Sequence, residues 1–421
     1  MIPVSPLKRI VIAGGGFGGM ALAKALRNKP YQVVLIDKNN YHTFQPLLYQ
    51  VATGGLEPDS IAFPLRKVFH GAENVVFRMA EIINVDFDKK NVDTTIGTIA
   101  FDFLVLATGS ANNFFNNTSV AENAMTLKSV SEALNIRSLV LQNLEAALVA
   151  DEKDRQALLN IVVAGAGPTG VEVAGALAEL RRHVIPNDYP ELKNLAINIY
   201  IVEASERVLA SMSEKSSEKA LLFLKKLGVI PRLNVKLDSY DGNTAVLSDG
   251  TIIPTKIVVW SAGVKGKLTG GIPESVITPG SRIEVNSFCQ VKGFDSVYAL
   301  GDVAMLSSKE NPKGFPMVAP VAIQQADLIA KNFLRMKEGK ELKAFHYFDK
   351  GSMATVGRNK AVVDLPFISF QGLFAWFAWM FVHLMSLVGF RNKLMVFINW
   401  LWSYFSYDRA VRLIIRPYKK K

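Results

Sequence analysis

Two glycine-rich segments, 151 positions apart, constrain this chain more than any other feature of its sequence. Residues 8–26 read KRIVIAGGGFGGMALAKAL, and residues 159–177 read LNIVVAGAGPTGVEVAGAL. Each segment runs from an apolar stretch of strand length through G-x-G-x-x-G into a pattern of helical period. A second pair, FDFLVLATGS at 101–110 and TKIVVWSAGV at 255–264, repeats at nearly the same offset. We therefore expect two copies of one nucleotide-binding module.

The glycine spacing in both segments suits the pyrophosphate of a dinucleotide. One glycine makes the tight turn, one lets the backbone approach the phosphates, and one lets the helix pack against the strand. The helix N-terminus then offers free N–H groups and the positive end of its dipole. A lone G-x-G-x-x-G also occurs in ordinary turns, so the prediction depends on the strand before and the helix after each copy. The glycines concerned are Gly14, Gly16, Gly19, Gly165, Gly167 and Gly170.

An acidic residue follows each glycine loop at the end of a second predicted strand. Asp37 ends VVLID, 23 residues after Gly14, and Glu203 ends NIYIVE, 38 residues after Gly165. The first spacing suits a carboxylate that accepts hydrogen bonds from ribose hydroxyls. The alternative for both acids is a solvated residue at a strand end. A carboxylate at Glu203 would repel a 2′-phosphate, so we expect the second module to prefer NADH to NADPH.

The single cysteine, Cys289, limits the chemistry that the side chains can perform. One cysteine cannot form an internal disulfide, a CxxC redox pair or a cysteine-based metal site. The five histidines show no ligand spacing such as HExxH, so no metal site is expected. Redox chemistry would have to be carried by a bound organic cofactor. Cys289 itself is expected to be a buried packing residue.

Several motifs resemble those of type II NADH dehydrogenases, the single-chain, non-pumping NADH:quinone oxidoreductases among the two-dinucleotide flavoproteins. They are NYHTFQPLLYQVATG at 40–54, GAGPTGVEVAGALAEL at 165–180, PMVAPVAIQQ at 316–325 and GFRNKL at 389–394. YALGDVA at 298–304 is similar to the motif that holds the FAD ribityl chain. The related disulfide reductases and sulfide:quinone oxidoreductases use paired cysteines, which this sequence lacks.

The resemblance covers essentially the whole chain and implies an α/β fold of the glutathione-reductase kind, with two Rossmann-type dinucleotide-binding domains. The FAD-binding domain would be discontinuous, at 1–112 and 290–365, and the NADH-binding domain would be inserted at 113–289. Residues 366–421 would form amphipathic, membrane-anchoring helices. FAD would be bound non-covalently, NADH would be the substrate and a membrane quinone the acceptor. The family also implies a homodimer, peripheral at the cytoplasmic face of the cell membrane, with no nucleic-acid partner.

The family motifs assign residues of this chain to both cofactors. Asp302 would bind the ribityl chain, and Thr108 and Gly109 would border the FAD site. Pro46 would lie along the isoalloxazine, the alternative being an ordinary turn proline, and Ala80 would meet the adenine through its main chain. The FAD set is Gly14, Gly16, Phe17, Gly18, Gly19, Asp37, Lys38, Pro46, Ala80, Thr108, Gly109, Asp302 and Ala319. The NADH set is Gly165, Gly167, Thr169, Gly170, Val171, Glu203 and Gly263.

The quinone side would be built from residues 316–326 and the turn around Lys350. In the family the first block is a helix whose N-terminus, here at Ala319, abuts the flavin. Many members have Ala-Gln where this chain has Ala319-Pro320, so contacts of that glutamine do not carry over, and Pro320 suits a first helical turn. The predicted quinone residues are Pro320, Ile323, Gln324, Lys350 and Met353.

Glu172 is the predicted catalytic acid, and Lys350 is its expected partner near the quinone head. Glu172 lies two residues after Gly170, which the sequence places in a first helical turn. By its family position it orients the nicotinamide and couples to proton uptake, and a buried acid there would have a raised pKa. The alternatives are that Glu172 only complements the helix dipole and that Lys350 is a solvated surface residue.

The C-terminal residues combine aromatic and basic side chains. Residues 367–390 carry no formal charge, and residues 391–421, with eight Lys or Arg and one Asp, account for +7 of the net +11. This pattern favours helices that lie in the interface of an anionic membrane, the alternative being a buried dimerisation pair. One apolar helix face is predicted from Leu394, Phe397, Ile398, Leu401 and Phe405. Interface positions are predicted for Trp376, Trp379, Trp400, Trp402 and Tyr404, and a basic side for Arg409, Arg412 and Arg416, followed by Lys419 to Lys421.

A flavoprotein that acts mainly as a binding module is the alternative from another functional class. Such a protein would resemble apoptosis-inducing factor, which binds nucleic acid through basic surfaces. It should spread Lys and Arg over its folded domains. Here the positive charge is concentrated in the tail, so the enzyme is the favoured hypothesis.

Overall fold

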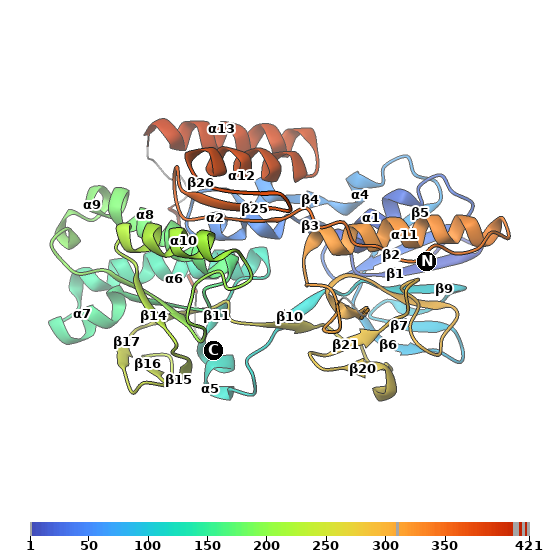
Figure 1. Ribbon diagram of the computed structural model, residues 1–421, viewed down its shortest axis with the longest axis horizontal. Helices are drawn as coiled ribbons and strands as arrows, with labels where there is room; N and C mark the ends of the chain where they lie inside the picture. The colour runs from blue at the N-terminus through green and yellow to red at the C-terminus, as the bar shows by residue number, and fades with distance from the viewer. Residues whose placement is uncertain (1, 309–310, 407–411, 415–416, 419–421) are drawn as a thin grey trace. The chain divides into compact units, whose positions relative to one another are not determined.

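The computed structural model describes residues 2–308, 311–406, 412–414 and 417–418 (Figure 1). Arg409, Arg416 and Lys419 to Lys421, predicted to be part of a basic side, lie outside the described residues. Contacts divide the chain into two compact units. Unit 1 comprises Met1–His42, Phe63–Asn112 and Val264–Asp349, and unit 2 comprises Thr43–Ala62, Asn113–Gly263 and Lys350–Lys421.

The bounds of these units differ from those of the predicted domains. Residues 264–289 belong to unit 1, and residues 350–421 belong to unit 2. Each predicted domain corresponds to the cofactor that it would hold, whereas the units reflect contacts alone. The domain assignment therefore stays a prediction.

Unit 1 is built on a five-stranded parallel sheet. Its order is β22 (Val297–Ala299), β9 (Phe103–Leu106), β1 (Arg9–Ala13), β2 (Gln32–Asp37) and β5 (Val75–Met79). The central strands are continuous apolar runs because helices cover such a sheet on both faces. β1 leads through the first glycine loop into α1 (Phe17–Ala25), which packs against α11 (Ala319–Lys337).

Unit 2 repeats this arrangement. Its parallel sheet has the order β11 (Met125–Thr126), β18 (Ile257–Trp260), β12 (Asn160–Ala164), β13 (Asn198–Glu203) and β14 (Ile230–Leu233). β12 leads through the second glycine loop into α8 (Pro168–His183). β9 and β18, the strands of the second sequence echo, each pair with the strand that enters a glycine loop. The predicted pair of Rossmann-type modules is confirmed.

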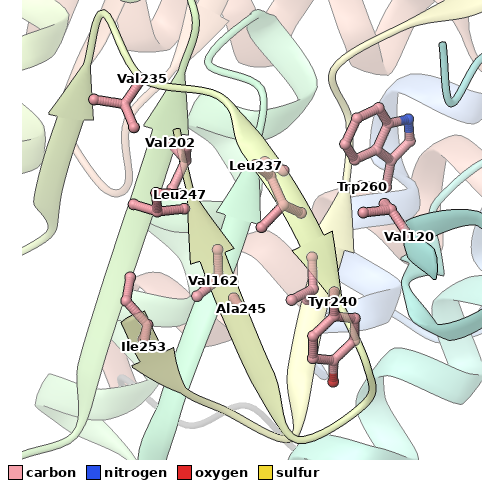
Figure 2. Packing of buried hydrophobic residues seen from close by; sticks show 12 residues of the cluster. Val120, Val162, Val202, Val235, Leu237, Tyr240, Ala245, Leu247, Ile253 and Trp260 are labelled. Atoms are coloured by element: carbon pink, nitrogen blue, oxygen red, sulfur yellow. The ribbon is translucent and has the colours of Figure 1, made fainter. Parts of the chain in front are cut away.

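A buried cluster joins the sheet of unit 2 to a small antiparallel sheet of β15 (Leu237–Tyr240), β16 (Thr244–Leu247) and β17 (Ile252–Pro254). Figure 2 shows Leu237 and Tyr240 among the valines of this cluster, with Trp260 beside Val120. The Trp260 indole N–H donates to the Asn113 carbonyl oxygen at 3.1 Å. This packing fixes the carboxyl end of β18 and the loop at Gly263 that follows it.

The C-terminal part of unit 2 forms an antiparallel sheet and two helices. The elements are β24 (Ser352–Thr355), β25 (Ala361–Leu365), β26 (Ile368–Gly372), α12 (Leu373–Ser386) and α13 (Phe390–Ser406). Figure 1 shows α12 and α13 side by side over β25 and β26. The uncharged stretch 367–390 is therefore not one helix, because residues 368–372 pair with β25 and Gly372, at φ 89°, starts α12. Within the described residues, no helix has the length and apolar character needed to cross a membrane.

The side chains of α13 divide into two groups. Asn392, Val396 and Trp400 are buried. The residues of the predicted apolar face are exposed; they are Leu394, Phe397, Ile398, Leu401 and Phe405. Trp379 and Trp400 were expected at an interface, but both are core residues, and Trp379 is only 1% exposed. Arg412, expected on a basic side, forms an ion pair with Asp188 at 2.6 Å.

The remaining described elements are short or peripheral to the two parallel sheets. In unit 1 they are α4 (Leu65–Val68), β6 (Ile82–Asp86), β7 (Asn91–Thr94), β8 (Gly97–Ala100), β10 (Ser110–Asn112), β19 (Val264–Gly266), η3 (Glu274–Val276), β20 (Ile277–Thr278), β21 (Arg282–Glu284), η4 (Gly301–Val303) and β23 (Ala304–Met305). In unit 2 they are η1 (Gln45–Leu47), α2 (Leu48–Ala52), α3 (Pro58–Ile61), α5 (Thr118–Asn123), α6 (Val130–Val149), α7 (Glu152–Leu159), α9 (Ile185–Asp188), η2 (Pro190–Leu192) and α10 (Glu214–Lys226). β3 (Tyr41–Thr43) and β4 (Ala62–Pro64) lie at the bounds of the units.

Cys289 is fully buried and free, as predicted.

Candidate functional site

The first glycine loop forms an open cradle at the N-terminus of α1. A Cβ on Gly19 would lie 1.8 Å from the Gly14 carbonyl oxygen, so only glycine lets the helix pack this closely on the loop. Gly14 has φ 115°, which other residues rarely adopt. A Cβ on Gly16, in contrast, would meet nothing within 4 Å, and Gly16 caps α1 without a side chain. Open space beside free N–H groups fits the phosphates of a dinucleotide.

The second loop repeats this geometry at the N-terminus of α8. A Cβ on Gly170 would lie 1.9 Å from the Gly165 carbonyl oxygen, and Gly165 has φ 101°. A Cβ on Gly167, the N-cap of α8, would again meet nothing within 4 Å. Each unit by itself therefore offers a cradle that fits a pyrophosphate.

The predicted ribose acids hold these loops through equivalent hydrogen bonds. The Gly15 N–H donates to Asp37 Oδ2 at 2.7 Å, and the Ala166 N–H donates to Glu203 Oε2 at 2.6 Å. Glu203 Oε1 also accepts from the backbone and the hydroxyl of Ser205, both at 2.9 Å. Both carboxylates are half-buried, so they can also accept from a ribose. They are not merely solvated residues at strand ends.

Other predicted FAD residues of unit 1 lie near the ends of its strands. The Ala80 N–H donates to the Asp37 carbonyl oxygen at 2.9 Å, which places Ala80 beside the acid. The Asp302 carboxylate accepts from the Ser110 hydroxyl at 2.6 Å. The Thr108 hydroxyl donates to the Lys267 carbonyl oxygen at 2.5 Å, and Gly109 has φ 72°.

The other predicted cofactor residues occupy varied environments. Phe17 contacts the His42 ring edge-on at 5.0 Å, and a Cβ on Gly18 would lie 2.2 Å from Leu300. Lys38 and Thr169 are exposed, Val171 is buried, and Pro46 is half-buried in η1 of unit 2. A Cβ on Gly263 would lie 2.7 Å from the Phe115 ring.

Two basic residues of unit 1 also belong to this neighbourhood. Burial lowers the pKa of Lys267, and the nearby Lys38 charge lowers it further, although Asp37 acts in the opposite direction. The His42 Nδ1–H donates to the Gly15 carbonyl oxygen at 3.1 Å, and burial lowers the pKa of His42 to about 4. The sequence motifs did not identify Lys267, which lies 159 residues from its partner Thr108.

The predicted quinone residues divide between the units. In unit 1, α11 begins at Ala319 with Pro320 in its first turn, as expected, and Ile323 is exposed. The side chain of Gln324 forms two 2.9 Å hydrogen bonds with the backbone of Phe348, so its amide is already engaged. In unit 2, Met353 is half-buried in β24 and Lys350 is exposed. In the part of the chain that the structure describes, no ion pair joins Lys350 to Glu172.

Glu172 is a buried acid on α8. Pro168 starts the helix, so Glu172 is its fifth residue, and the expectation of a first-turn position is wrong. An acid at the fifth helical position interacts only weakly with the helix dipole, because that interaction falls off beyond the first turn. Burial raises the pKa of Glu172 to about 8, although a hydrogen bond from the Thr355 N–H and the nearby Trp379 indole favour its charged form. Glu172 is therefore mostly protonated at pH 7, as a proton donor requires.

Comparisons with known proteins agree with this geometry. The sequence profile of the pyridine nucleotide-disulphide oxidoreductase family matches residues 8–326, and that of the NDH2 C-terminal domain matches residues 349–406. The chain is 34% identical to the type II NADH:quinone oxidoreductase Ndh of Mycobacterium tuberculosis over 96% of this chain and 89% of that protein. It is 30% identical to the type II NADH:quinone oxidoreductase of Haemophilus influenzae, over 90% and 93% of the two chains.

A solved structure supports the fold. NDH2 from Plasmodium falciparum in complex with NADH aligns with a TM-score of 0.90 at 20% identity, over 97% of this chain and all of that chain. The likeness extends through the C-terminal sheet and helices as well as the two parallel sheets.

Proposed function

The chain belongs to the type II NADH:quinone oxidoreductases of the pyridine nucleotide-disulphide oxidoreductase family, and from this membership we propose how its residues divide the work. The enzyme oxidises NADH and reduces a quinone, with FAD as the bound cofactor. The observation that carries the assignment is the pair of cradles, each with an acid hydrogen-bonded to its own glycine loop. Purified protein supplied with NADH and a water-soluble quinone should reduce that quinone, and absence of the reaction would overturn the assignment.

The first cradle holds FAD and the second holds NADH in this proposal. The open space at Gly16 and at Gly167 receives a pyrophosphate in each case. Asp37 and Glu203 accept from the adenosine ribose of FAD and NADH, respectively. Asp302, held by the Ser110 hydroxyl, binds the ribityl chain. The remaining residues of the predicted FAD and NADH sets border these groups.

The reaction takes up one proton from solution in each turnover. NADH gives a hydride, which carries two electrons and one proton, whereas a quinone needs two electrons and two protons to become a quinol. When bound, FAD would supply the redox chemistry that takes the hydride from NADH and delivers its two electrons and one proton to the quinone. Glu172, protonated at neutral pH, supplies or relays the remaining proton. In this proposal the quinone contacts are Lys350, which precedes β24, and Met353 on that strand. Pro320, Ile323 and Gln324 on α11 are the other proposed quinone residues.

The exposed apolar side chains of α12 and α13 support attachment to a membrane. Many large apolar side chains exposed together on two neighbouring helices mark an interaction site. We propose that this outer apolar face lies in the headgroup region of a bilayer, so that the enzyme is peripheral at the cytoplasmic face. The face consists of Leu373, Phe374, Phe377, Phe381, Val382, Met385, Phe390, Leu394, Met395, Phe397, Ile398, Leu401, Trp402 and Phe405. A homodimer is also proposed, and its support is the family resemblance alone.

The binding-module alternative has less support. The two relatives above are named as oxidoreductases. The net positive charge is concentrated in the C-terminal residues rather than spread over the two sheets.

Glu203→Gln should narrow the preference for NADH over NADPH. A neutral amide removes the repulsion of a 2′-phosphate and weakens the hydrogen bond to the ribose. Together these changes should alter the relative binding free energy of the two cofactors by about 1–3 kcal/mol. The ratio of kcat/KM for NADH to that for NADPH should fall by roughly 10- to 100-fold. Glu206→Gln, which neutralises an exposed acid three residues further on, serves as the control and should leave the ratio unchanged. An unchanged ratio in the Glu203 variant would show that another residue selects the cofactor.

Glu172→Gln should slow turnover and remove a pH dependence. The pKa of Glu172 is raised to about 8, so the acid form is present below that pH and is lost above it. Wild-type quinone reduction should therefore decline as the pH rises through about 8, and the glutamine variant should be slower without this inflection. FAD content should be unchanged in the variant. Wild-type rates in the variant across about pH 6 to 9 would leave Glu172 without a role in proton transfer.

A further inference from the structure

A cavity of about 840 Å³, counting its mouth open to solvent, lies beside α8 in unit 2. Its wall is formed by α2, α8, α12, α13 and the turn after β24. Ala176, Glu179 and His183 line it from α8, at the spacing of one helix face. Glu172 precedes Ala176 by four residues, so it lies one turn further along the same face. The cavity thus extends along α8 from solvent toward the buried acid.

Two residues of the cavity wall connect it to Glu172. Thr355 and Trp379 both line the cavity, and both favour the charged form of Glu172, Thr355 through a hydrogen bond from its backbone N–H. The Trp379 Nε1 atom is buried and forms no hydrogen bond of normal geometry with any of the described residues. Its ring is held by stacking on His383 at 4.0 Å and by contact with Trp400 at 5.9 Å. An N–H without a competing acceptor is available to a carboxylate formed beside it.

The surroundings of the cavity contain both charged and titratable groups. These groups are Glu179 and His183 on α8, Arg358 after β24, Tyr49 on α2, His383 on α12 and Tyr404 on α13. The Arg358 guanidinium donates to the carbonyl oxygens of Ser403 and Tyr404, and its backbone N–H donates to Glu179. Its charge is thus directed to the end of α13 rather than to Glu172. Burial lowers the pKa of His383 to about 4, so its ring is neutral at pH 7.

We propose that this cavity is the inlet through which Glu172 exchanges its proton with solvent, and that Trp379 is the positioning residue for that exchange. The inference rests on the proposed function, in which Glu172 provides a proton during turnover. When the carboxyl loses its proton, the N–H groups of Thr355 and Trp379 stabilise the carboxylate. A proton from solution, relayed by water in the cavity, then returns to the carboxylate. The C-terminal segment, through Trp379 on α12, thereby sets how readily Glu172 gives up its proton.

Infrared titration of the resting FAD-loaded enzyme tests the role of Trp379. The carbonyl band of protonated Glu172 is identified by its loss in Glu172→Gln and is followed from about pH 5 to 10. Trp379→Phe keeps an aromatic ring and removes the N–H, so the midpoint should rise by about one pH unit or more. Trp400→Phe is the matched control, because its indole N–H donates to Gln50 Oε1 at 2.7 Å, and its midpoint should equal that of the wild type. An unchanged midpoint in Trp379→Phe, or an equal shift in both variants, would overturn the role of Trp379.

A second variant tests the inlet itself. Ala176→Leu extends a side chain into the cavity one turn from Glu172 while leaving both N–H groups in place. After a pH jump, the carbonyl band of Glu172 should reach its new intensity at least about tenfold more slowly than in the wild type. The midpoint of the Glu172 titration should be unchanged. Recovery at the wild-type rate would contradict the inlet. Neither infrared measurement needs turnover, so a protein that passes both but does not reduce quinone would refute the proposed function and leave the inlet standing.

Discussion

Gly19→Ala should yield a protein without bound FAD, whereas Gly170→Ala should yield a flavoprotein that NADH no longer reduces efficiently. In each variant the new Cβ would lie within 2 Å of a backbone oxygen, at 1.8 Å for Gly19 and 1.9 Å for Gly170. Backbone atoms cannot rotate away as a side chain can, so the helix must separate from its glycine loop. The N–H groups that receive the pyrophosphate then lose their positions. Displacement of about 1 Å can reduce a rate by about 100-fold, and we expect kcat/KM for NADH to fall by at least that factor in Gly170→Ala.

Flavin absorbance per protein and the rate of reduction by NADH measure the two effects separately. Gly55→Ala is the control, because its Cβ would have no neighbour nearer than 3.4 Å, an ordinary contact distance, and it should keep both properties. Full FAD content in Gly19→Ala, or normal reduction by NADH in Gly170→Ala, would contradict the assignment of FAD to the first cradle and NADH to the second.

The combined variant Phe374→Glu, Phe381→Glu and Phe405→Glu should lose binding to anionic vesicles while keeping NADH oxidation with a soluble acceptor. These side chains are 80%, 66% and 76% exposed, so their replacement removes no core packing. Burying a phenylalanine side chain contributes about 1.5–3 kcal/mol, so three charged replacements should weaken partitioning by at least about 100-fold. Reduction of a quinone embedded in the vesicles should fall in parallel. Deletion of residues 367–421 would be a less clear test, because it would also remove the buried Trp379 and Trp400.

Sedimentation with vesicles measures this binding. Ile252→Glu is the control, because it places a charge on an exposed apolar residue of β17, far along the chain from α12 and α13. It should sediment with vesicles as the wild type does. High salt should weaken the binding of the wild type to vesicles without abolishing it. Salt shortens the range of charge interactions below about 10 Å but leaves the apolar contribution to binding. Full sedimentation of the triple variant would refute the outer apolar face as the membrane contact.

The sequence predicted the parts of the fold that depend on local patterns. Strand, glycine loop and helix follow one another within about 20 residues in each module, so the duplicated segment at 159–177 identified the second cradle as clearly as the first. Glycine roles are also local, since the packing of Gly19 and Gly170 on their own loops depends on residues five positions away.

Features that depend on tertiary packing could not be predicted in this way. Residues 368–372 carry no charge, and only their pairing with β25 makes them a strand rather than a helix. Trp379 and Trp402 look alike in the sequence, yet one is a core residue and the other is exposed. The contact of Trp379 with Glu172 joins positions more than 200 residues apart and has no local signal. The same holds for Lys267, which comes from a distant segment of the chain and lies near Asp37 and Lys38.

Anaerobic mixing of the purified enzyme with NADH, followed by a short-chain quinone, tests the central claim most directly. Two cradles in one chain predict a flavoprotein whose FAD absorbance is bleached by one equivalent of NADH and restored by one equivalent of quinone. The account also predicts the uptake of one proton from solution for each quinol formed, which a pH indicator in weak buffer can record. A protein whose flavin is bleached by NADH but is not reoxidised by quinone, or one that NADH does not reduce, would contradict the account.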